Sequence, residues 1–522
     1  MLMAISFNNI SPNVRTPGAY VEIDNSRALQ GLIQNPHKVL ILGQLAEGLT
    51  TPTPTATHDA LYAITRDNLA DGFFGMGSVL ARMCNTFKDN NPNTELYAMA
   101  IGSGIAGTAA ETKIDVGGAV YSTGVSCNGT WYLMINGESV DVAITSGMTP
   151  ESIATDTVAA INSNSNLPVT AAVNGTSAGR VDISAVCSGT LGNYINIREN
   201  FYDYQSTPLD FVSGSVGPLT IGSGGIASRI FFSVMQGGAT DPDLGDAWAV
   251  IEGEQFHYVI QPFINAPNLT EIEDEMADRF LPLEDLQGHA FTAVRGDQAS
   301  CTTLGNTRNS PHNTIVGTYD SPTCPEEWAA AWGAVCAWNL NNDPARPLHT
   351  LKLKGILAPP IENRFTRAER DILLYDGIAT WTTDSSAAVL IERSITTYQT
   401  NSFGFADSSY LDIQTLATLG EIRYQYKARC LNRFIQPRFK LADDTFPAQP
   451  GSKVCRPKDV KAETIALFTL LRDKGLIENL DEFIDNLVVE RDTTDRNRVN
   501  VLLPCDVINQ FLILAGNVQF IL

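Results

Sequence analysis

Short apolar runs alternate with segments of helical spacing in two stretches of the chain, residues 36–101 and 229–400. Residues 39–42 and 258–260 have the length and the β-branched, apolar character of buried strands. The stretch 58–87 has apolar residues at helical spacing, interrupted by glycines. Strands that alternate with helices form largely parallel sheets covered by helices, so the pattern predicts an α/β core.

Capping motifs predict where helices of this core begin. Thr270-x-x-Glu273 and Thr366-x-x-Glu369 match the capping box, in which two side chains satisfy free backbone N–H groups. Pro325 suits the first position of a further helix, because its fixed φ is helical and its missing N–H is not needed there. We therefore expect three helices to start at these points.

Composition changes near residue 102, and residues 102–228 are rich in Gly, Ser, Thr, Asn and Val. Asn-Gly pairs at 136–137 and 174–175 stand between β-type runs and predict hairpins with type I′ turns. Thr149 followed by Pro150 predicts the start of one helix. The stretch is therefore expected to be a β-rich domain inserted into the α/β core.

The C-terminal part, residues 401–510, mixes helical and β-type segments and is expected to be an α+β domain. Its clearest element is a helix over 458–474 that ends at Gly475. The last residues, 511–522, are apolar and strand-forming, and a strand at a chain end needs a sheet to pair with. The residues that we expect to pair there are Phe511, Leu512, Ile513, Val518, Phe520 and Ile521.

Residues 1–35 are interrupted by Pro and Gly and contain one short β-type run. This segment is expected to be an extended arm. The residues of its candidate strand are Tyr20, Val21, Glu22 and Ile23.

Length and charge restrict the possible functions. A chain of 522 residues is expected to form several domains. Its 35 basic and 57 acidic residues give a formal charge of -22, the wrong sign for general nucleic-acid binding. No signal peptide and no membrane-spanning apolar run is recognised, so we expect a protein kept soluble inside a cell. Nine scattered cysteines without a C-x-x-C pair argue against a disulfide framework and a zinc site.

Motifs that could carry chemistry lack the required context. Residues 102–107 match G-x-G-x-x-G, but β-type sequence follows in place of the helix that would bind a pyrophosphate. Residues 175–179 match G-x-S-x-G around Ser177, but at an expected hairpin tip and not at a strand-to-helix turn. The six histidines show no i, i+4 pair. We therefore predict no catalytic, cofactor-binding or metal-binding residues.

A basic segment at 421–440 stands out from the acidic chain. Its Lys and Arg residues either form a solvated face or meet acidic faces of neighbouring subunits or of another acidic protein. The basic residues are Arg423, Lys427, Arg429, Arg433, Arg438 and Lys440, and Glu421 is the single acidic one.

Three segments resemble the contractile tail sheath family of bacteriophages, in its Mu-like branch. They are SPNVRTPGAYVEID at 11–24, FGMGS at 74–78 and RSITTY at 393–398. Each is short, and the resemblance rests on their order and spacing across about 400 residues of the chain.

The resemblance implies a subtilisin-like α/β/α core without protease activity, and N- and C-terminal arms that add strands to sheets of adjacent subunits. It further implies a helical sheath that polymerises around a tail tube and contracts to drive the tube through the host envelope. The implied partners are other copies of the chain and the tail tube, baseplate and tail terminator proteins, without nucleic acid or membrane insertion. The implied location is the virion tail, after assembly in the host bacterial cytoplasm.

Three alternatives remain open at this point. An adhesin or capsid protein would share the β-rich composition of the insert but would not need the long α/β part. A serine hydrolase would rest on the motif around Ser177 alone. A tail tube protein would polymerise too, but it would be expected to be smaller and dominated by β structure.

Overall fold

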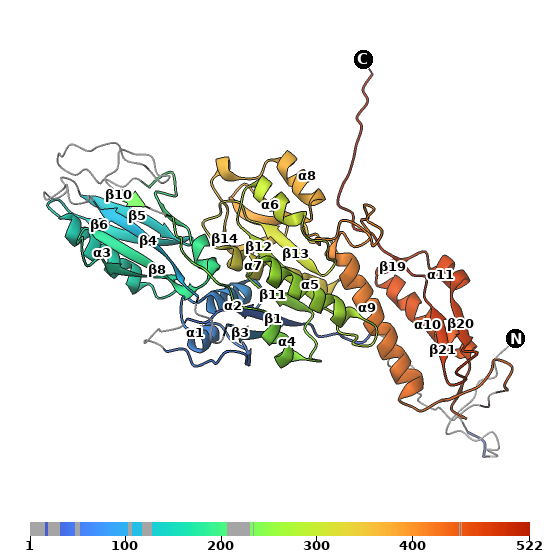
Figure 1. Cartoon of the computed structure of the whole chain (residues 1–522). Helices are drawn as coiled ribbons and strands as arrows, with labels where there is room; N and C mark the ends of the chain where they lie inside the picture. Colours follow the sequence, from blue (N-terminus) through green and yellow to red (C-terminus); the bar gives the residue numbers. More distant parts are fainter. Residues whose placement is uncertain are drawn as a thin grey trace. The chain divides into compact units, whose positions relative to one another are not determined.

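A computed structural model describes residues 16–18, 32–46, 53–102, 107–116, 128–205, 230–232, 234–447, 449 and 452–521. The chain divides into two compact units. The core unit comprises Pro36–Gly420 and Asn509–Leu522, and the C-terminal unit comprises Met1–Asn35 and Glu421–Ile508. Helices and strands of both units are labelled in Figure 1.

The core unit is built on a nine-stranded sheet. Its strand order is β14 (Lys352–Leu357), β16 (Ala388–Arg393), β15 (Ile378–Thr383), β13 (Asn313–Gly317), β12 (His289–Val294), β11 (Tyr258–Ile260), β1 (Lys38–Gly43), β3 (Glu95–Ala100) and β2 (Leu61–Ala63). Neighbours from β15 to β3 pair in parallel, and the strands at both ends of the sheet pair antiparallel. The predicted α/β core is confirmed.

Helices cover both faces of this sheet. Successive side chains of a strand point to opposite faces. Accordingly, Val316 of β13 packs in the apolar cluster that contains α2 and α7, whereas its neighbour Ile315 packs in the cluster that contains α6 and α8. The helices of the core unit are α1 (Leu69–Phe74), α2 (Val79–Asn90), α4 (Gly245–Ile251), α5 (Ala266–Phe280), α6 (Gln298–Gly305), α7 (Pro325–Asn342), the short 3-10 helix η3 (Ile361–Asn363) and α8 (Arg367–Tyr375). The core is therefore a three-layer α/β/α arrangement.

Two of the three predicted helix starts are confirmed. Helix α7 begins at Pro325, and helix α8 begins after Thr366, whose side chain accepts a hydrogen bond from the N–H of Glu369 in a complete capping box. The third prediction was wrong, because α5 begins at Ala266 and Thr270 lies within it. The side chain of Asn265 caps α5, and Pro267 lies in its first turn. These two residues start the helix before the predicted capping box at Thr270 is reached.

The inserted segment folds as two sheets and a helix (Figure 1). One sheet has the order β10 (Ile230–Phe232), β4 (Ala109–Val116), β8 (Arg180–Ser188) and β7 (Val169–Val173). The other has the order β6 (Glu138–Ile144), β5 (Gly129–Ile135) and β9 (Ile197–Glu199). Between them in sequence lie α3 (Pro150–Ser163), capped by Thr149 as predicted, and a short 3-10 helix, η2 (Thr190–Tyr194). Strand β10 lies past residue 228, so the β sheet extends beyond the predicted boundary of the insert.

Only one of the two predicted turns has the expected type. Asn136 and Gly137 both have positive φ, 52° and 81°, and join β5 to β6 in the predicted type I′ turn. The other hairpin, β7–β8, exists, but residues 174–179 form a longer loop. In this loop the side chain of Asn174 accepts hydrogen bonds from the N–H groups of Thr176 and Ser177, which explains why Asn is favoured there without a two-residue turn.

The C-terminal unit combines helices with short two-stranded sheets. Helix α9 (Ile413–Cys430) begins in the core unit and continues past Gly420 into the C-terminal unit. The remaining elements are a π-helix, η4 (Leu431–Ile435), β17 (Lys440–Leu441), β18 (Val454–Cys455), α10 (Pro457–Asp473), β19 (Ile477–Glu478), α11 (Leu480–Asn486), β20 (Val488–Arg491), β21 (Val499–Leu502) and β22 (Asp506–Val507). The stacked rings of Phe468 and Phe483, with centroids 4.0 Å apart, join α10 to α11. The predicted helix over 458–474 is confirmed, and Gly475 has the positive φ of a helix end.

Candidate functional site

The motif around Ser177 does not form a nucleophile elbow. Ser177 lies in the loop before β8, where its N–H donates to the side chain of Asn174 and its carbonyl accepts from Arg180. A strand follows in place of the helix that the elbow requires. The other motif, residues 102–107, ends just before strand β4, and residues 103–106 lie outside the described part of the chain.

The carboxyl edge of the parallel sheet, where open α/β sheets usually bind ligands, is filled by the insert. The type I′ turn of β5–β6 reaches the N-terminus of α7, whose own N-cap, Cys324, makes no side-chain cap. Asn136 supplies the other half of a cap, because its Oδ1 accepts from the N–H of the N-cap residue Cys324 at 2.8 Å, as the N3 side chain does in a capping box, and its Nδ2 donates to Glu327 at 3.0 Å. Cys187 and Leu191 of the insert also pack in the main apolar cluster of the core.

Charged side chains at this edge are buried in pairs. The guanidinium of Arg82 on α2 contacts Glu326 at 2.6 Å and Glu327 at 3.0 Å, and both carboxylates belong to the first turn of α7. Burial alone would lower the pKa of Arg82, but Glu327 and Glu326 raise it overall, so the arginine stays charged. A second pair, Arg198 with Asp320, is only half-buried and joins the insert to the loop before α7. These contacts fix the insert on the core and leave little room for a ligand.

The amino edge of the same sheet carries a row of histidines. His37, His257, His289 and His312 each stand at or directly before the first residue of β1, β11, β12 and β13, which are neighbours in the sheet. The rings of His37 and His257 are stacked with centroids 4.2 Å apart. Nδ1 of His257 accepts from the N–H of Lys38 at 3.2 Å, and Nε2 of His289 lies 2.8 Å from the hydroxyl of Thr314. We call these four residues the histidine row.

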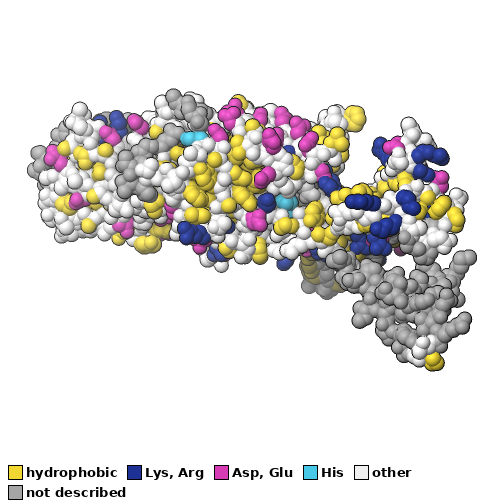
Figure 2. All heavy atoms as spheres, turned by 90° about the horizontal axis from the view of Figure 1, so that it is seen from below, with side chains coloured by type: hydrophobic (Ala, Val, Ile, Leu, Met, Phe, Trp, Pro, Cys, Tyr) yellow, Lys and Arg dark blue, Asp and Glu magenta, His cyan; other side chains and the backbone are white. Residues whose placement is uncertain are grey.

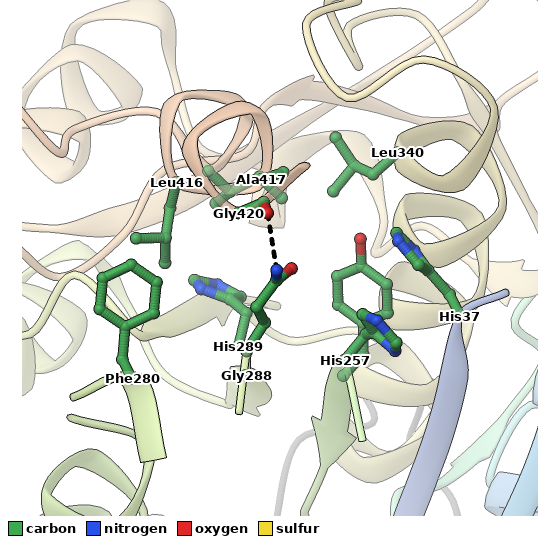
Figure 3. Close-up of a pocket in the computed structure, with 12 residues that line it drawn as sticks. His37, His257, Phe280, Gly288, His289, Leu340, Leu416, Ala417 and Gly420 are labelled. Carbon is green, nitrogen blue, oxygen red and sulfur yellow. Dashed lines mark hydrogen bonds between the residues drawn. The ribbon is translucent and has the colours of Figure 1, made fainter. Parts of the chain in front are cut away.

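A small cavity of about 40 Å³ lies between the histidine row and the first turns of α9 (Figure 3). Leu416, Ala417 and Gly420 of α9 face the histidines across it, and Gln287 donates to the carbonyl of Gly420 at 2.6 Å. Burial lowers the pKa of His37 to about 4 and that of His289 to about 3, and burial with the nearby His37 and Lys38 lowers the pKa of His257 well below its usual value. These imidazoles are therefore neutral at pH 7.

No metal site is found at either edge among the described residues. Within the described ranges, no group of three or more His, Cys, Asp or Glu residues is arranged to hold a metal ion. In the same part of the chain, no helix is long and apolar enough to cross a bilayer. The histidine row does not appear as a spacing pattern in the sequence. Its signal there is that each histidine begins an apolar strand or directly precedes one.

The C-terminal segment exposes several large apolar side chains. Residues 509–521 form no strand and make an extended trace that ends at the C-terminus (Figure 1). Leu512 is half-buried, and the other candidate residues are exposed: Phe511 by 73%, Ile513 by 79%, Val518 by 91%, Phe520 by 79% and Ile521 by 99%. The candidate strand of the N-terminal arm, Tyr20 to Ile23, lies outside the described residues.

The sheet β20–β21 in the C-terminal unit was not singled out from the sequence. It has two antiparallel strands, with Val488 directly opposite Leu502. These two side chains are 46% and 61% exposed, whereas Val489 and Val501 of the next pair are half-buried. Strand β20 packs on α10. The signal in the sequence was the β-type run at 488–491, which is too short to be assigned by itself.

The basic strip is spread over α9, η4 and the residues up to β17. Lys and Arg side chains gather on the surface of the C-terminal unit in Figure 2. Part of the strip is neutralised within the chain, because Glu463 of α10 contacts Arg429 at 2.5 Å and Arg433 at 3.5 Å. Lys427, Arg433, Arg438 and Lys440 are exposed, and Arg423 is half-buried with an interaction of its own. The structure thus leaves a smaller basic surface than the six residues suggested.

Comparison with known proteins identifies relatives along the whole chain. Residues 237–397 match the phage tail sheath protein central domain, and residues 406–521 match the phage tail sheath C-terminal domain. Solved sheath tail proteins from Desulfitobacterium hafniense and Listeria innocua are 12% and 11% identical, with TM-scores of 0.45 and 0.46. The alignments cover 94% and 92% of this chain and 100% and 94% of those chains.

A curated relative is more similar in sequence. The Mu-like prophage FluMu tail sheath protein of Haemophilus influenzae is 35% identical over 521 residues, which is 100% of either chain. The predicted resemblance is thereby confirmed. The chain belongs to the contractile phage tail sheath family, in its Mu-like branch, and is a structural sheath subunit.

Proposed function

We propose that copies of this chain polymerise as a helical cylinder around a tail tube, and that contraction of the cylinder drives the tube through the host envelope. The observation that carries this proposal is the apolar C-terminal segment, which is exposed and forms no strand of its own over residues 509–521. Such a segment would be an aggregation hazard if it stayed unpaired. We infer that it adds a strand to a sheet of a neighbouring subunit.

The sheet β20–β21 is the acceptor that we propose for this arm. A two-stranded sheet is marginally stable by itself and gains from further strands. Its exposed pair Val488 and Leu502 offers apolar contacts to an added strand that carries Phe511 and Ile513. We propose that the N-terminal arm, with Tyr20 to Ile23, adds a second strand in the same way.

Contraction then needs no nucleotide. Subunits assembled in an extended, metastable lattice can pass to a compact lattice with more favourable contacts once one end is triggered. A gain of about 1 to 3 kcal/mol for each subunit, the size of a typical coupling energy, would sum to a large total over many copies. Paired arms would keep neighbours connected while the units between them reorient.

The further partners in this proposal are the tail tube, baseplate and tail terminator proteins. The exposed part of the basic strip, Lys427, Arg433, Arg438 and Lys440, would meet acidic surfaces of neighbouring subunits or of the tube. The proposed location is the virion tail, after assembly in the host bacterial cytoplasm. We also propose that the α/β/α core has a subtilisin-like layout. We propose no hydrolase activity, because the insert fills the carboxyl edge where α/β sheets usually bind ligands.

Truncation after Gln510 tests the arm. We expect the truncated chain to remain monomeric, with a melting temperature close to that of the full subunit, and to form no cylinders in electron micrographs. Ile513→Pro, which removes a backbone donor, should weaken assembly in the same direction, and Ile513→Val, which keeps the donor and the β propensity, is the matched control. Normal cylinders from the truncated chain, or its unfolding, would show that the segment pairs within its own subunit.

A further inference from the structure

We propose that the histidine row is an acid-sensitive latch that holds the first turns of α9 on the core sheet while its imidazoles are neutral. The inference concerns the fold of a single subunit, so it holds whether or not the arms exchange strands. It assigns a regulatory role to a site that the proposed sheath function does not use.

The hydrogen bond at His257 has no place for an added proton, whereas at His289 the backbone of Pro311 favours the charged ring less than burial and His312 oppose it. Nδ1 of His257 accepts from the backbone N–H of Lys38, so it must be unprotonated. The neighbouring ring of His37 is stacked on it at 4.2 Å, and a charge on both rings would be strongly repulsive. His289 shares a hydrogen bond with the hydroxyl of Thr314, which itself donates to the carbonyl of Ile395, so Nε2 of His289 is the donor.

Among the described residues, no carboxylate lines the cavity beside His37, His257 and His289 to stabilise a charged imidazole. None of the described residues that line the cavity is Asp or Glu. The titratable neighbours are Lys38 of β1, Tyr258 of β11 and His312 before β13, and none of them carries a negative charge at neutral or acidic pH. The remaining walls come from α5, α7 and α9 and are formed by Phe280, Leu340, Ile413, Leu416 and Ala417.

The first turns of α9 line the cavity with apolar side chains, and the carbonyl of Gly420 accepts a hydrogen bond from Gln287. A Cβ added to Gly420 would meet Oε1 of Gln287 at 2.6 Å, so a side chain at this position would require Gln287 to move. The cavity beneath has room for a few water molecules. A charged imidazole could be hydrated only if α9 moved away and admitted more water, and this is the motion that we infer.

Movement of the first turns of α9 would affect the chain that follows them. The helix passes from the core unit into the C-terminal unit at residue 420, and it carries the first residues of the basic strip. Release of residues 413–420 would loosen the segment that connects the two units. Acid would therefore free the first turns of α9 before the insert or the sheet unfolds.

The expected acid range follows from the pKa values of the row. An imidazole in an open, hydrated state has a pKa near 6.5. In the closed state the pKa of His37 is about 4 and that of His289 about 3. Each such group favours the open state by about tenfold for every pH unit below 6.5, until its closed-state pKa is reached. Opening should therefore begin between pH 6.5 and 4.

Hydrogen exchange read by mass spectrometry tests the latch in the full chain, with exchange times scaled to the intrinsic rate at each pH. In the wild type we expect peptides covering 413–420 to lose protection on acidification, while peptides from β4 and β8 of the insert stay protected. The double variant His37→Phe with His257→Asn keeps a ring in the stack and an acceptor for Lys38, but cannot be protonated there. It should shift the pH of half protection downward by about 0.5 to 1 unit.

Two further variants make the test decisive. His289→Gln keeps a donor for Thr314 and should also shift the midpoint downward, so the result does not depend on the double variant folding. His349→Gln, at an exposed residue outside the row, is the matched control and should leave the midpoint unchanged. An unchanged midpoint in both row variants would overturn the latch, as would simultaneous loss of protection in α9 and in the insert.

Discussion

The two edges of the parallel core sheet bury ionisable side chains in opposite ways. At the carboxyl edge, Arg82 is buried with Glu326 and Glu327, so opposite charges compensate each other. At the amino edge, His37, His257 and His289 line a cavity without a carboxylate in the described part of the chain, and their lowered pKa values keep these rings neutral at pH 7. Burial raises the pKa of Glu327 even beside Arg82, so both edges can respond to acid, but only the histidines would gain a charge that lacks a nearby counter-charge lining the described cavity.

The two edges are also closed by different parts of the chain. The insert closes the edge where α/β sheets usually bind ligands, and Asn136 on its turn caps the helix that would otherwise face a ligand. The other edge is closed by α9, which leads out of the core. The carboxyl edge, with its charged residues, is thus covered by the insert. The amino edge, with its histidines, is covered by α9.

The largest effect is expected from Arg82→Met. This change leaves Glu326, which is 1% exposed, and Glu327 buried without their cation, and we expect a loss of about 3 to 5 kcal/mol in the free energy of unfolding. Urea unfolding of the unassembled subunit measures it. The triple variant with Glu326→Gln and Glu327→Gln is the control and should recover part of the loss. A loss below about 1 kcal/mol for Arg82→Met would mean that the paired charges do not stabilise this edge.

A smaller effect, dependent on pH, is expected at the other edge. The pKa of His289 is about 3 when folded and near 6.5 when unfolded, so its contribution to stability is complete above pH 6.5 and falls as the pH drops toward 3. When the pH is lowered from 7 to 5, the free energy of unfolding of His289→Gln should therefore fall by about 2 kcal/mol less than that of the wild type. Urea unfolding at both pH values measures the difference, with His349→Gln as control. An equal pH dependence in both variants would contradict the contrast between the edges.

The smallest effect is expected from Asn136→Ala, which removes the cap that the insert supplies to α7. The N–H of Cys324 would lose its acceptor, and we expect a loss of about 1 to 2 kcal/mol. Asn174→Ala is the matched control, because Asn174 lies in the other hairpin and its side chain bonds only to residues of the insert, Thr176, Ser177 and Asp182. If both variants unfold identically when followed by tryptophan fluorescence, Asn136 does not couple the insert to α7.

Local signals in the sequence predicted much of the fold. The apolar run of β1, the proline that begins α7, the capping box of α8 and the glycine that ends α10 were all assigned correctly. They could be read because each depends on residues within a few positions of each other. The capping box assigned to Thr270 was wrong, because Asn265 and Pro267 formed a stronger start five residues earlier.

Candidate site residues were harder to predict, because a surface is made by residues distant in sequence. The exposed apolar residues of the C-terminal segment could be named from the sequence, since a terminal β-type run needs no other segment to be recognised. The pairing of Glu463 with Arg429 and Arg433 could not, because α10 lies about 30 residues further along the chain. The sheet β20–β21 was missed for the same reason, as two short runs define it only together.

By itself, the sequence determined the alternation of strands and helices, the β-rich insert, the acidic charge and the family of this protein. These properties are carried by local patterns or by the order of short segments. Only the tertiary structure decided which edge of the sheet the insert fills and that four histidines stand side by side. Hydrogen bonding between parallel strands sets neighbours that are remote in sequence, so residues 37, 257, 289 and 312 become one row.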